Sequence, residues 1–405
     1  SDLVVSGEGV SVRLVEYFRV LNNQELALLR QQLNELRKKE STVGDVMVAK
    51  MAWFEFPTPI GPAEELKQGQ ANANDGRSEK EIAKQNLIKR IESLLAEDER
   101  NPAVRAHSEL VFAEVTVASE ARPGRREIRV ISKRGISNAL PFYVGQVPEV
   151  ARTPIKTAKK PVLGKESLAQ RKRPPEEEEM HITVPCTMNG QVAAGEVNRY
   201  RFQASKGQRL LISTKARQLV PYVADGVPGW FQAVLRLHDS SGNEVAYNDD
   251  YRFDPDPVIH FEVPADGEYV LTINEALFRG RESFTYRITI GELPFITSIF
   301  PLGGRVDEPV QIEMKGWNLE QATLSAPSSE AEPGTQQLAA STGQLLSNYV
   351  PFALDTLPEC LDVESNDSPD KAQKVTLPIT VNGRADHPGD WDVFEVQGKA
   401  CLLYT

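Results

Sequence analysis

The chain has 405 residues, of which 25% are charged and 40% hydrophobic, and its formal net charge is −11. This is ordinary globular composition, and the length predicts roughly two to four domains. The acidic balance argues against a nucleic-acid partner, since phosphate binding needs a clustered basic face. No apolar run approaches the ~18 residues that span a bilayer. Ser1 opens the chain without a signal pattern, and both ends are expected to be cut from a longer protein.

Two sequence blocks each occur twice, in the order A, B, A, B. The A block is SNALPF at 137–142 and SNYVPF at 347–352. The B block is VPCTMNG at 184–190 and LPITVNG at 377–383. Self-similarity of this kind is typical of arrays of small modules.

The first A module is expected over residues 1–150. Strand-like segments lie near 4–15, 110–117, 126–131 and 140–144. Between them, apolar residues recur at spacings of three and four, which predicts a helical hairpin inserted at about 22–100. They are Leu26, Leu29, Leu33 and Leu36, and then Leu87 or Ile88, Ile91 and Leu95. The stripe could instead bind a coiled-coil partner, but under three heptads an intramolecular pair is favoured.

A change of composition marks residues 151–180. Lysines, arginines and prolines give way to the run Glu176 to Glu179. The basic cluster could bind a polyanion, but the prolines and neighbouring glutamates favour an extended, solvated linker.

The first B module is expected over 181–291. Short alternating segments with turns between them predict an antiparallel sandwich or jelly roll. The predicted strands are 199–204, 209–214, 232–238, 244–247, 258–263, 268–273 and 284–290.

A second A module is expected over 293–358, with a strand at 309–314 and a loop over the Ser/Ala/Gln-rich segment 325–343. A second B module begins near 361 and ends at 405 after about two strands, too few to be stable alone. The predicted fold class is therefore mainly β: tandem immunoglobulin-like and jelly-roll sandwich modules, with a helical hairpin insertion in the first.

Several motifs of the B modules resemble the bacterial pre-peptidase C-terminal (PPC) domain. They are Pro-x-Thr-x-Asn-Gly in both copies, LRLHD at 235–239, GNEVAYNDD at 242–250 and PADGEY at 264–269. The resemblance implies a jelly roll of the kind attached to secreted peptidases and related to collagen-binding domains of collagenases.

The A modules are similar to immunoglobulin-like TIG modules. The second A module carries this resemblance in PLGG at 301–304 and GWNL at 316–319, and the first in PG at 123–124 and GISN at 135–138. The alternation of both modules resembles large secreted proteins of planctomycete-type bacteria. It implies an extracytoplasmic location: secreted, periplasmic or on the cell surface.

The resemblance to collagen-binding domains also implies a calcium site at the entry to the second B module. It carries the ligand role to Glu364, Asn366, Asp367, Asp390 and Asp392. These residue types suit calcium, which takes six to eight oxygen ligands. The alternative is a plain turn and helix cap, which Asn, Asp, Ser and Pro also favour.

The first B module has a degraded form of this pattern. The aligned positions are Glu196 and Asn198, and the entry segment is EEEM at 177–180. This module is expected to lack the entry site.

A second acidic group lies in the first B module. Asn248, Asp249 and Asp250, with Asp254 and Asp256 nearby, could cage a cation. A solvated turn between two strands is the commoner meaning of such a run.

Enzymatic motifs are missing from the sequence. The five histidines form no His-x-x-x-His or His-Glu-x-x-His pattern, and there is no Gly-x-Ser-x-Gly elbow or phosphate-binding loop. We therefore expect no catalysis within this chain. Cys186, Cys360 and Cys401 are widely separated, and the first two are expected to be buried free thiols.

The function expected is a non-catalytic binding or spacer segment whose partners are an extracellular polymer or protein and neighbouring modules of the same chain. Tyr222, Trp230 and Phe231 could form a contact patch or pack over the sandwich end. The alternative is an accessory region of a secreted peptidase whose catalytic domain lies outside these residues.

Overall fold

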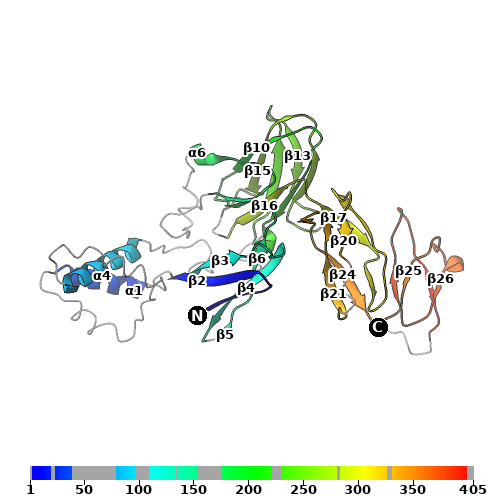
Figure 1. The fold of residues 1–405 in the computed structure, drawn as a ribbon, viewed down its shortest axis with the longest axis horizontal. Helices are drawn as coiled ribbons and strands as arrows, with labels where there is room; N and C mark the ends of the chain where they lie inside the picture. Colours follow the sequence, from blue (N-terminus) through cyan, green and yellow to red (C-terminus); the bar gives the residue numbers. More distant parts are fainter. Residues whose placement is uncertain are drawn as a thin grey trace. The chain divides into compact units, whose positions relative to one another are not determined.

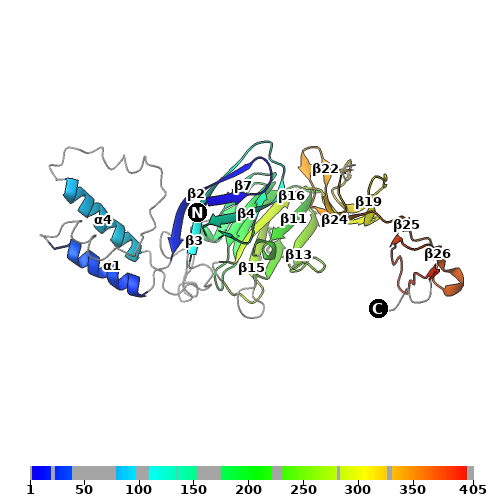
Figure 2. The same ribbon diagram turned by 90° about the horizontal axis from the view of Figure 1, so that it is seen from below.

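The computed structural model describes residues 2–19, 23–38, 79–96, 109–133, 135–152, 175–220, 230–280, 283–325 and 331–398. These residues form mainly β-structure in several sheets (Figures 1 and 2), which confirms the predicted fold class. The chain divides into two compact units, one with most of residues 1–290 and the other with residues 208–211, 260–262 and 291–405. None of the described helices is both long and apolar enough to cross a membrane.

The first unit opens with a small β module. Its strand β4 (Gly124–Ser132) pairs with β1 (Asp2–Val5), β5 (Gly135–Ile136) and β6 (Leu140–Val144). A second antiparallel pair joins β2 (Val10–Arg19) to β3 (Glu109–Val117).

A helical hairpin lies between β2 and β3 in the sequence, as predicted. Helices α1 (Asn23–Leu36) and α4 (Glu79–Ala96) run side by side in both views. Their shared core is Leu29, Leu33, Leu36 and Ile91, which are the residues of the apolar stripe. The helices therefore bury their apolar faces against each other.

Two five-stranded sheets form the sandwich that follows. One sheet has the order β13-β12-β15-β10-β8 and the other β14-β11-β16-β9-β7. The strands are β7 (Glu149–Ala151), β8 (Glu179–His181), β9 (Cys186–Gln191), β10 (Asn198–Ala204), β11 (Arg209–Lys215), β12 (Ala233–His238), β13 (Glu244–Asn248), β14 (Val258–Glu262), β15 (Gly267–Glu275) and β16 (Thr285–Gly291). The seven strands predicted from the sequence lie within two residues of β10 to β16. Strand β10 alternates buried with more exposed residues, whereas β15 is buried without alternation over most of its length.

The ends of the expected linker belong to this sandwich, which corrects its bounds of 151–180. Residue 151 ends β7, which pairs in parallel with β9, and β8 pairs in parallel with β10. A short helix, α6 (Pro175–Glu178), precedes β8. The glutamate run is not wholly solvated, since the Glu179 carboxylate accepts hydrogen bonds from Arg199 (3.2 Å) and Arg201.

The second unit opens with another β module. Its core holds Ile296, Ile299, Leu338, Ala340, Phe352 and Leu354. The strands are β17 (Phe295–Phe300), β18 (Gly303–Arg305), β19 (Glu313–Trp317), β20 (Thr323–Leu324), β21 (Gly334–Leu338), β22 (Ala340–Thr342), β23 (Leu345–Leu346) and β24 (Val350–Asp355). The likeness of both A modules to TIG modules stays a prediction.

Two expectations about this module were wrong. The strand expected at 309–314 is β19, which begins at Glu313. The segment 325–343, expected to be a loop, contains β21 and β22. Its polar composition hides two core positions, because Leu338 is 4% exposed and Ala340 is fully buried.

Over its described residues, which end at 398, the second B module has four short strands where about two were expected. Strand β25 (Glu359–Leu361) pairs in parallel with β27 (Thr380–Asn382), and β26 (Gln373–Val375) pairs in parallel with β28 (Phe394–Val396). These two pairs repeat β7 with β9 and β8 with β10. The sequence repeat is therefore a structural repeat.

The cysteines are free where they are described. Cys186 is buried and Cys360 is half-buried, so the expectation of two buried thiols holds only for Cys186. Cys401 lies outside the described residues.

Candidate metal centre

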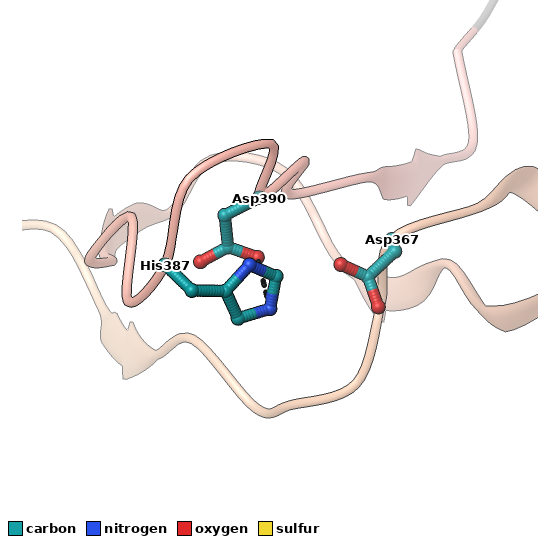
Figure 3. A group of neighbouring side chains, drawn as sticks. All are labelled: Asp367, His387 and Asp390. Atoms are coloured by element: carbon teal, nitrogen blue, oxygen red, sulfur yellow. Dashed lines mark ion pairs between the residues drawn. The ribbon is translucent and has the colours of Figure 1, made fainter.

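Acidic side chains converge at the entry to the second B module. Oxygen atoms of Asp362, Glu364 and Asp392 lie within 4.8 Å of one another, and ligand atoms of Asp367, His387 and Asp390 do the same. Figure 3 shows the second group, with Asp367 on one segment and His387 and Asp390 on the loop before β28. Five carboxylates and an imidazole are thus brought together from two stretches of chain.

Backbone bonds hold the two stretches in place. Asp362 follows β25, and its N–H donates to the Asn382 carbonyl of β27 at 2.8 Å. The Val393 N–H donates to the Asn366 carbonyl at 3.1 Å, which ties the entry segment to the loop that carries Asp390 and Asp392.

Gly383 marks where the first group of carboxylates meets. A Cβ atom at this position would lie 3.5 Å from Oδ2 of Asp362 and 3.5 Å from Oδ2 of Asp392. The two oxygens therefore face the same point beside β27.

Two buried oxygens near the cluster are left without a protein donor. Asn366 is 1% exposed, and its Nδ2 donates to Oδ1 of Asp362 at 2.7 Å. Its own Oδ1 and the Oδ1 of Asp390 have no hydrogen-bond partner among the described residues. The Asp390 side chain is 1% exposed, and Nε2 of His387 lies 3.6 Å from its Oδ1. A buried acceptor without a donor destabilises the folded state unless a cation or a water molecule binds to it.

Loss of solvent, followed by mutual repulsion, shifts the pKa values of two carboxyl groups in the cluster. Partial loss of solvent and then the charge of Asp390 raise the pKa of Glu364 above its usual value. Loss of solvent and then Asp362 raise the pKa of Asp392. The Asp386 N–H, by contrast, lowers the pKa of Asp390. Neighbouring carboxylates thus disfavour one another's charged form.

The structure brings together the acidic residues that the sequence singled out. Glu364, Asp367, Asp390 and Asp392 all belong to the two groups, and Asn366 bonds to a member of one. Sequence reasoning missed Asp362 and His387. Asp362 stands two residues before Glu364, and that alternating acidic spacing is the signal that could have found it.

The other acidic run, Asn248 to Asp250, has protein partners. Oδ1 of Asn248 accepts from the Val258 N–H at 3.0 Å, and Oδ2 of Asp249 accepts from the Tyr247 hydroxyl at 3.0 Å. Asp250 is exposed. These contacts are those of a turn between β13 and β14.

Asp256, at the end of the same run, is only 2% exposed and caps the 3-10 turn at Arg217–Leu219. It accepts backbone N–H bonds from Ala216 (3.0 Å), Arg217 (2.6 Å) and Gln218 (3.1 Å). Both carboxylate oxygens of Asp256 therefore stabilise this turn by accepting backbone hydrogen bonds.

The aromatic residues considered as a contact patch differ in position. Phe231 is 1% exposed and stacks on Phe284 with ring centroids 5.4 Å apart, so it packs into the sandwich end. Trp230 is half-buried, and Tyr222 lies outside the described residues.

Comparisons with known proteins bear on the first B module. Residues 196–275 match the family described as "Bacterial pre-peptidase C-terminal domain", which confirms the PPC resemblance there. Among the curated proteins, no match was found.

Several solved structures are similar to part of the chain. The pre-peptidase C-terminal domain of collagenase from Bacillus anthracis is 20% identical, with 30% of this chain and 99% of that one covered at a TM-score of 0.22. PliG from Aeromonas hydrophila, a periplasmic lysozyme inhibitor, is 14% identical. The match covers 28% of this chain and 97% of that one, with a TM-score of 0.19. The secreted serine protease VesC from Vibrio cholerae is 11% identical. The match covers 51% of this chain and 36% of that one, with a TM-score of 0.18.

Proposed function

We propose that the acidic cluster of the second B module binds calcium, and that this chain is a calcium-stiffened, non-catalytic segment of an exported protein. The observation that carries the proposal is the convergence of five carboxylates beside two buried oxygens, Oδ1 of Asn366 and Oδ1 of Asp390, that accept no hydrogen bond from the described residues. A divalent cation would supply positive charge to carboxylates that otherwise repel one another.

Calcium fits this donor set better than other common cations. Six oxygen-bearing side chains are available (Asp362, Glu364, Asn366, Asp367, Asp390 and Asp392), and calcium takes six to eight oxygens in flexible geometry. Magnesium requires a tighter octahedron and keeps several waters. His387 is not required as a ligand, because it ion-pairs with Asp390 when it is protonated.

The effect of the ion would be to join chain segments. The entry segment 362–367 and the loop 386–392 contribute all the oxygens. The first leads into β26 and the second into β28, and these two strands pair in parallel. A bound cation would therefore fix the start of the module onto its first strands.

The experiment is a calorimetric titration of calcium chloride into the chain, and into an Asp390→Ala/Asp392→Ala variant. Saturable binding that the double variant loses is the expected result. An Asp249→Ala/Asp250→Ala variant removes equal charge from the other acidic run and should bind as the wild type does. Absence of binding by the wild type would refute the calcium site.

The location and partners belong to the same proposal. PPC domains are modules of secreted proteins, and the first B module matches that family. We infer an extracytoplasmic segment whose modules present loops or sheet faces to an extracellular polymer or protein.

A second function is favoured by the family description itself, which places such domains beside peptidases. The chain would then be the accessory region of a secreted peptidase, with catalysis elsewhere in the protein. The complete reading frame tests it: a peptidase domain on the same chain supports the accessory role, and its absence supports the binding or spacer role.

A further inference from the structure

Arg152 and Asp362 hold equivalent positions in the two B modules. Each follows a three-residue strand that begins at Glu149 or Glu359. The Arg152 N–H donates to the Asn189 carbonyl at 2.9 Å, and the Asp362 N–H donates to the Asn382 carbonyl at 2.8 Å. Asn189 and Asn382 occupy the same place in the repeated motif. A basic side chain in one module thus replaces an acidic one in the other.

The surrounding turn is also shared. The Glu196 N–H donates to the Ala193 carbonyl at 3.1 Å, as the Asp390 N–H does to the His387 carbonyl at 3.1 Å. The Glu196 carboxylate accepts from the Ala193 N–H at 2.8 Å. Asp390 accepts the Asp386 N–H in the same way, so the turn and its acidic residue are common to both modules, and the difference lies at Arg152 and Asp362.

The Arg152 guanidinium is buried, and its two Nη atoms face carbonyl oxygens, while its Nε has no hydrogen-bond partner among the described residues. The residue is 5% exposed. Nη1 donates to the Arg199 carbonyl at 3.2 Å, and Nη2 donates to the carbonyls of Glu177 and Glu178, the latter at 3.3 Å. Its Cζ lies 5.5 Å from the centroid of the Tyr200 ring.

These contacts join parts of the first module that correspond to the two stretches that the acidic cluster joins in the second. Arg152 follows β7, Glu177 and Glu178 precede β8, and Arg199 lies in β10. In the second module, Asp362 follows β25, residues 364–367 precede β26, and Asp390 and Asp392 precede β28. A guanidinium is always charged and offers five donors in a fixed plane, which suits several carbonyls at once.

We propose that the Arg152 guanidinium is the built-in cation of the first B module, doing there what calcium does in the second. The proposal rests on the calcium site proposed above. The chain would then contain one module that is ordered without metal and one that responds to calcium, so that calcium regulates only the second module.

The test is hydrogen exchange measured by mass spectrometry on the whole chain, in EDTA and in calcium chloride. In the wild type, peptides covering β8 and β10 should exchange equally in both buffers, and peptides covering 362–367 and 386–392 should be protected by calcium. In Arg152→Ala, exchange in β8 and early β10 should rise about ten-fold or more in both buffers. Arg125→Ala, at an exposed arginine, is the matched control.

Chemical rescue separates a cation's role from lost packing. Millimolar methylguanidinium should restore protection in Arg152→Ala, and urea at the same concentration should not. Unchanged exchange in Arg152→Ala, absent rescue, or calcium-dependent protection of β8 in the wild type would each overturn the inference. If exchange in the peptides covering 362–367 and 386–392 does not change with calcium while the other results hold, the proposed calcium site is refuted. The equivalence between Arg152 and calcium is then refuted too, but the role of Arg152 in joining β7, β8 and β10 stands.

Discussion

Asn382 makes in the second B module the bond that Asn189 makes in the first. Nδ2 of Asn382 donates to Oε2 of Glu359 at 2.8 Å, and Nδ2 of Asn189 donates to Oε2 of Glu149 at 3.0 Å. The asparagine of the repeated Asn-Gly motif therefore fastens the parallel entry strand to the sheet. Asn382 also accepts the Leu302 N–H at 3.0 Å.

Replacing Asn382 by alanine should destabilise the second unit. Asn382 is 7% exposed, so its loss leaves the Leu302 N–H and the Glu359 carboxylate without this partner. We expect a fall of about 1–3 kcal/mol in the free energy of unfolding, measured by urea denaturation. Gln337→Ala, at an exposed residue of β21, should change it by less than about 0.5 kcal/mol. Equal effects of the two substitutions would contradict the assigned role.

Gly190 should not tolerate a methyl group. A Cβ there would lie 2.3 Å from the hydroxyl oxygen of Tyr286. That hydroxyl is fixed by the Tyr200 hydroxyl (2.6 Å) and by Nδ2 of Asn198 (2.7 Å), and so it cannot move cheaply. Gly190→Ala should lower the free energy of unfolding by about 1–3 kcal/mol.

Gly267→Ala is the matched control for this substitution. Gly267 begins β15, and a Cβ at this position would meet nothing within 4 Å. Because alanine restricts the unfolded chain more than glycine does, this change should be neutral or slightly stabilising. A melting temperature for Gly190→Ala as high as that of Gly267→Ala would refute the predicted clash.

The Glu149–Arg287 ion pair should make stability depend on acid pH. Burial by itself raises the pKa of Glu149, but hydrogen bonds and charge from Arg287, with the Asn189 amide, lower it overall from 4.5. A lowered folded-state pKa stabilises the fold above the unfolded value, and this contribution is lost as pH falls through the folded pKa.

The stability difference between wild type and Glu149→Gln should therefore shrink as pH falls from about 7 to about 3. The Glu149 side chain is 39% exposed, so solvent screening limits the contribution to about 1 kcal/mol or less. Denaturation curves across this range measure it. A difference that does not change with pH would show that the ion pair contributes nothing.

Calcium should raise the thermal stability of the second unit. Ligand binding to the folded state at 100 times the dissociation constant adds about 2.7 kcal/mol. Magnesium at equal concentration should add less, because it needs stricter octahedral geometry. Thermal scans with added EDTA, calcium or magnesium give the comparison, and a response to calcium that survives in Asp390→Ala/Asp392→Ala would place the ion elsewhere.

Periodicity predicted most of the first sandwich and the helical hairpin. Strands such as β10 alternate buried and partly exposed residues, and Leu29, Leu33 and Leu36 follow a helical stripe, so local sequence carries the signal. The acidic cluster was found through a family resemblance and not from spacing alone. Its members lie up to 30 residues apart, Asp362 to Asp392, and only the fold brings them together.

Short strands were the main omission. Strands β7, β8, β21 and β22 have three to five residues, and their polar side chains carry no periodic signal. They form because neighbouring strands offer free backbone groups. The role of Arg152 was hidden for the same reason, since its acceptors are carbonyls and carry no side-chain signature.

The short parallel strands β7 and β8 also decide where this sandwich can safely be cut. They lie at one end of each five-stranded sheet, beside β9 and β10. An uncovered sheet edge is a template for association with other chains, and very short edge strands are one of the ways in which proteins block it. The family match begins only at residue 196. A fragment started there would lack β7, β8 and β9, and it would expose the backbone of β10 and β16 to aggregation.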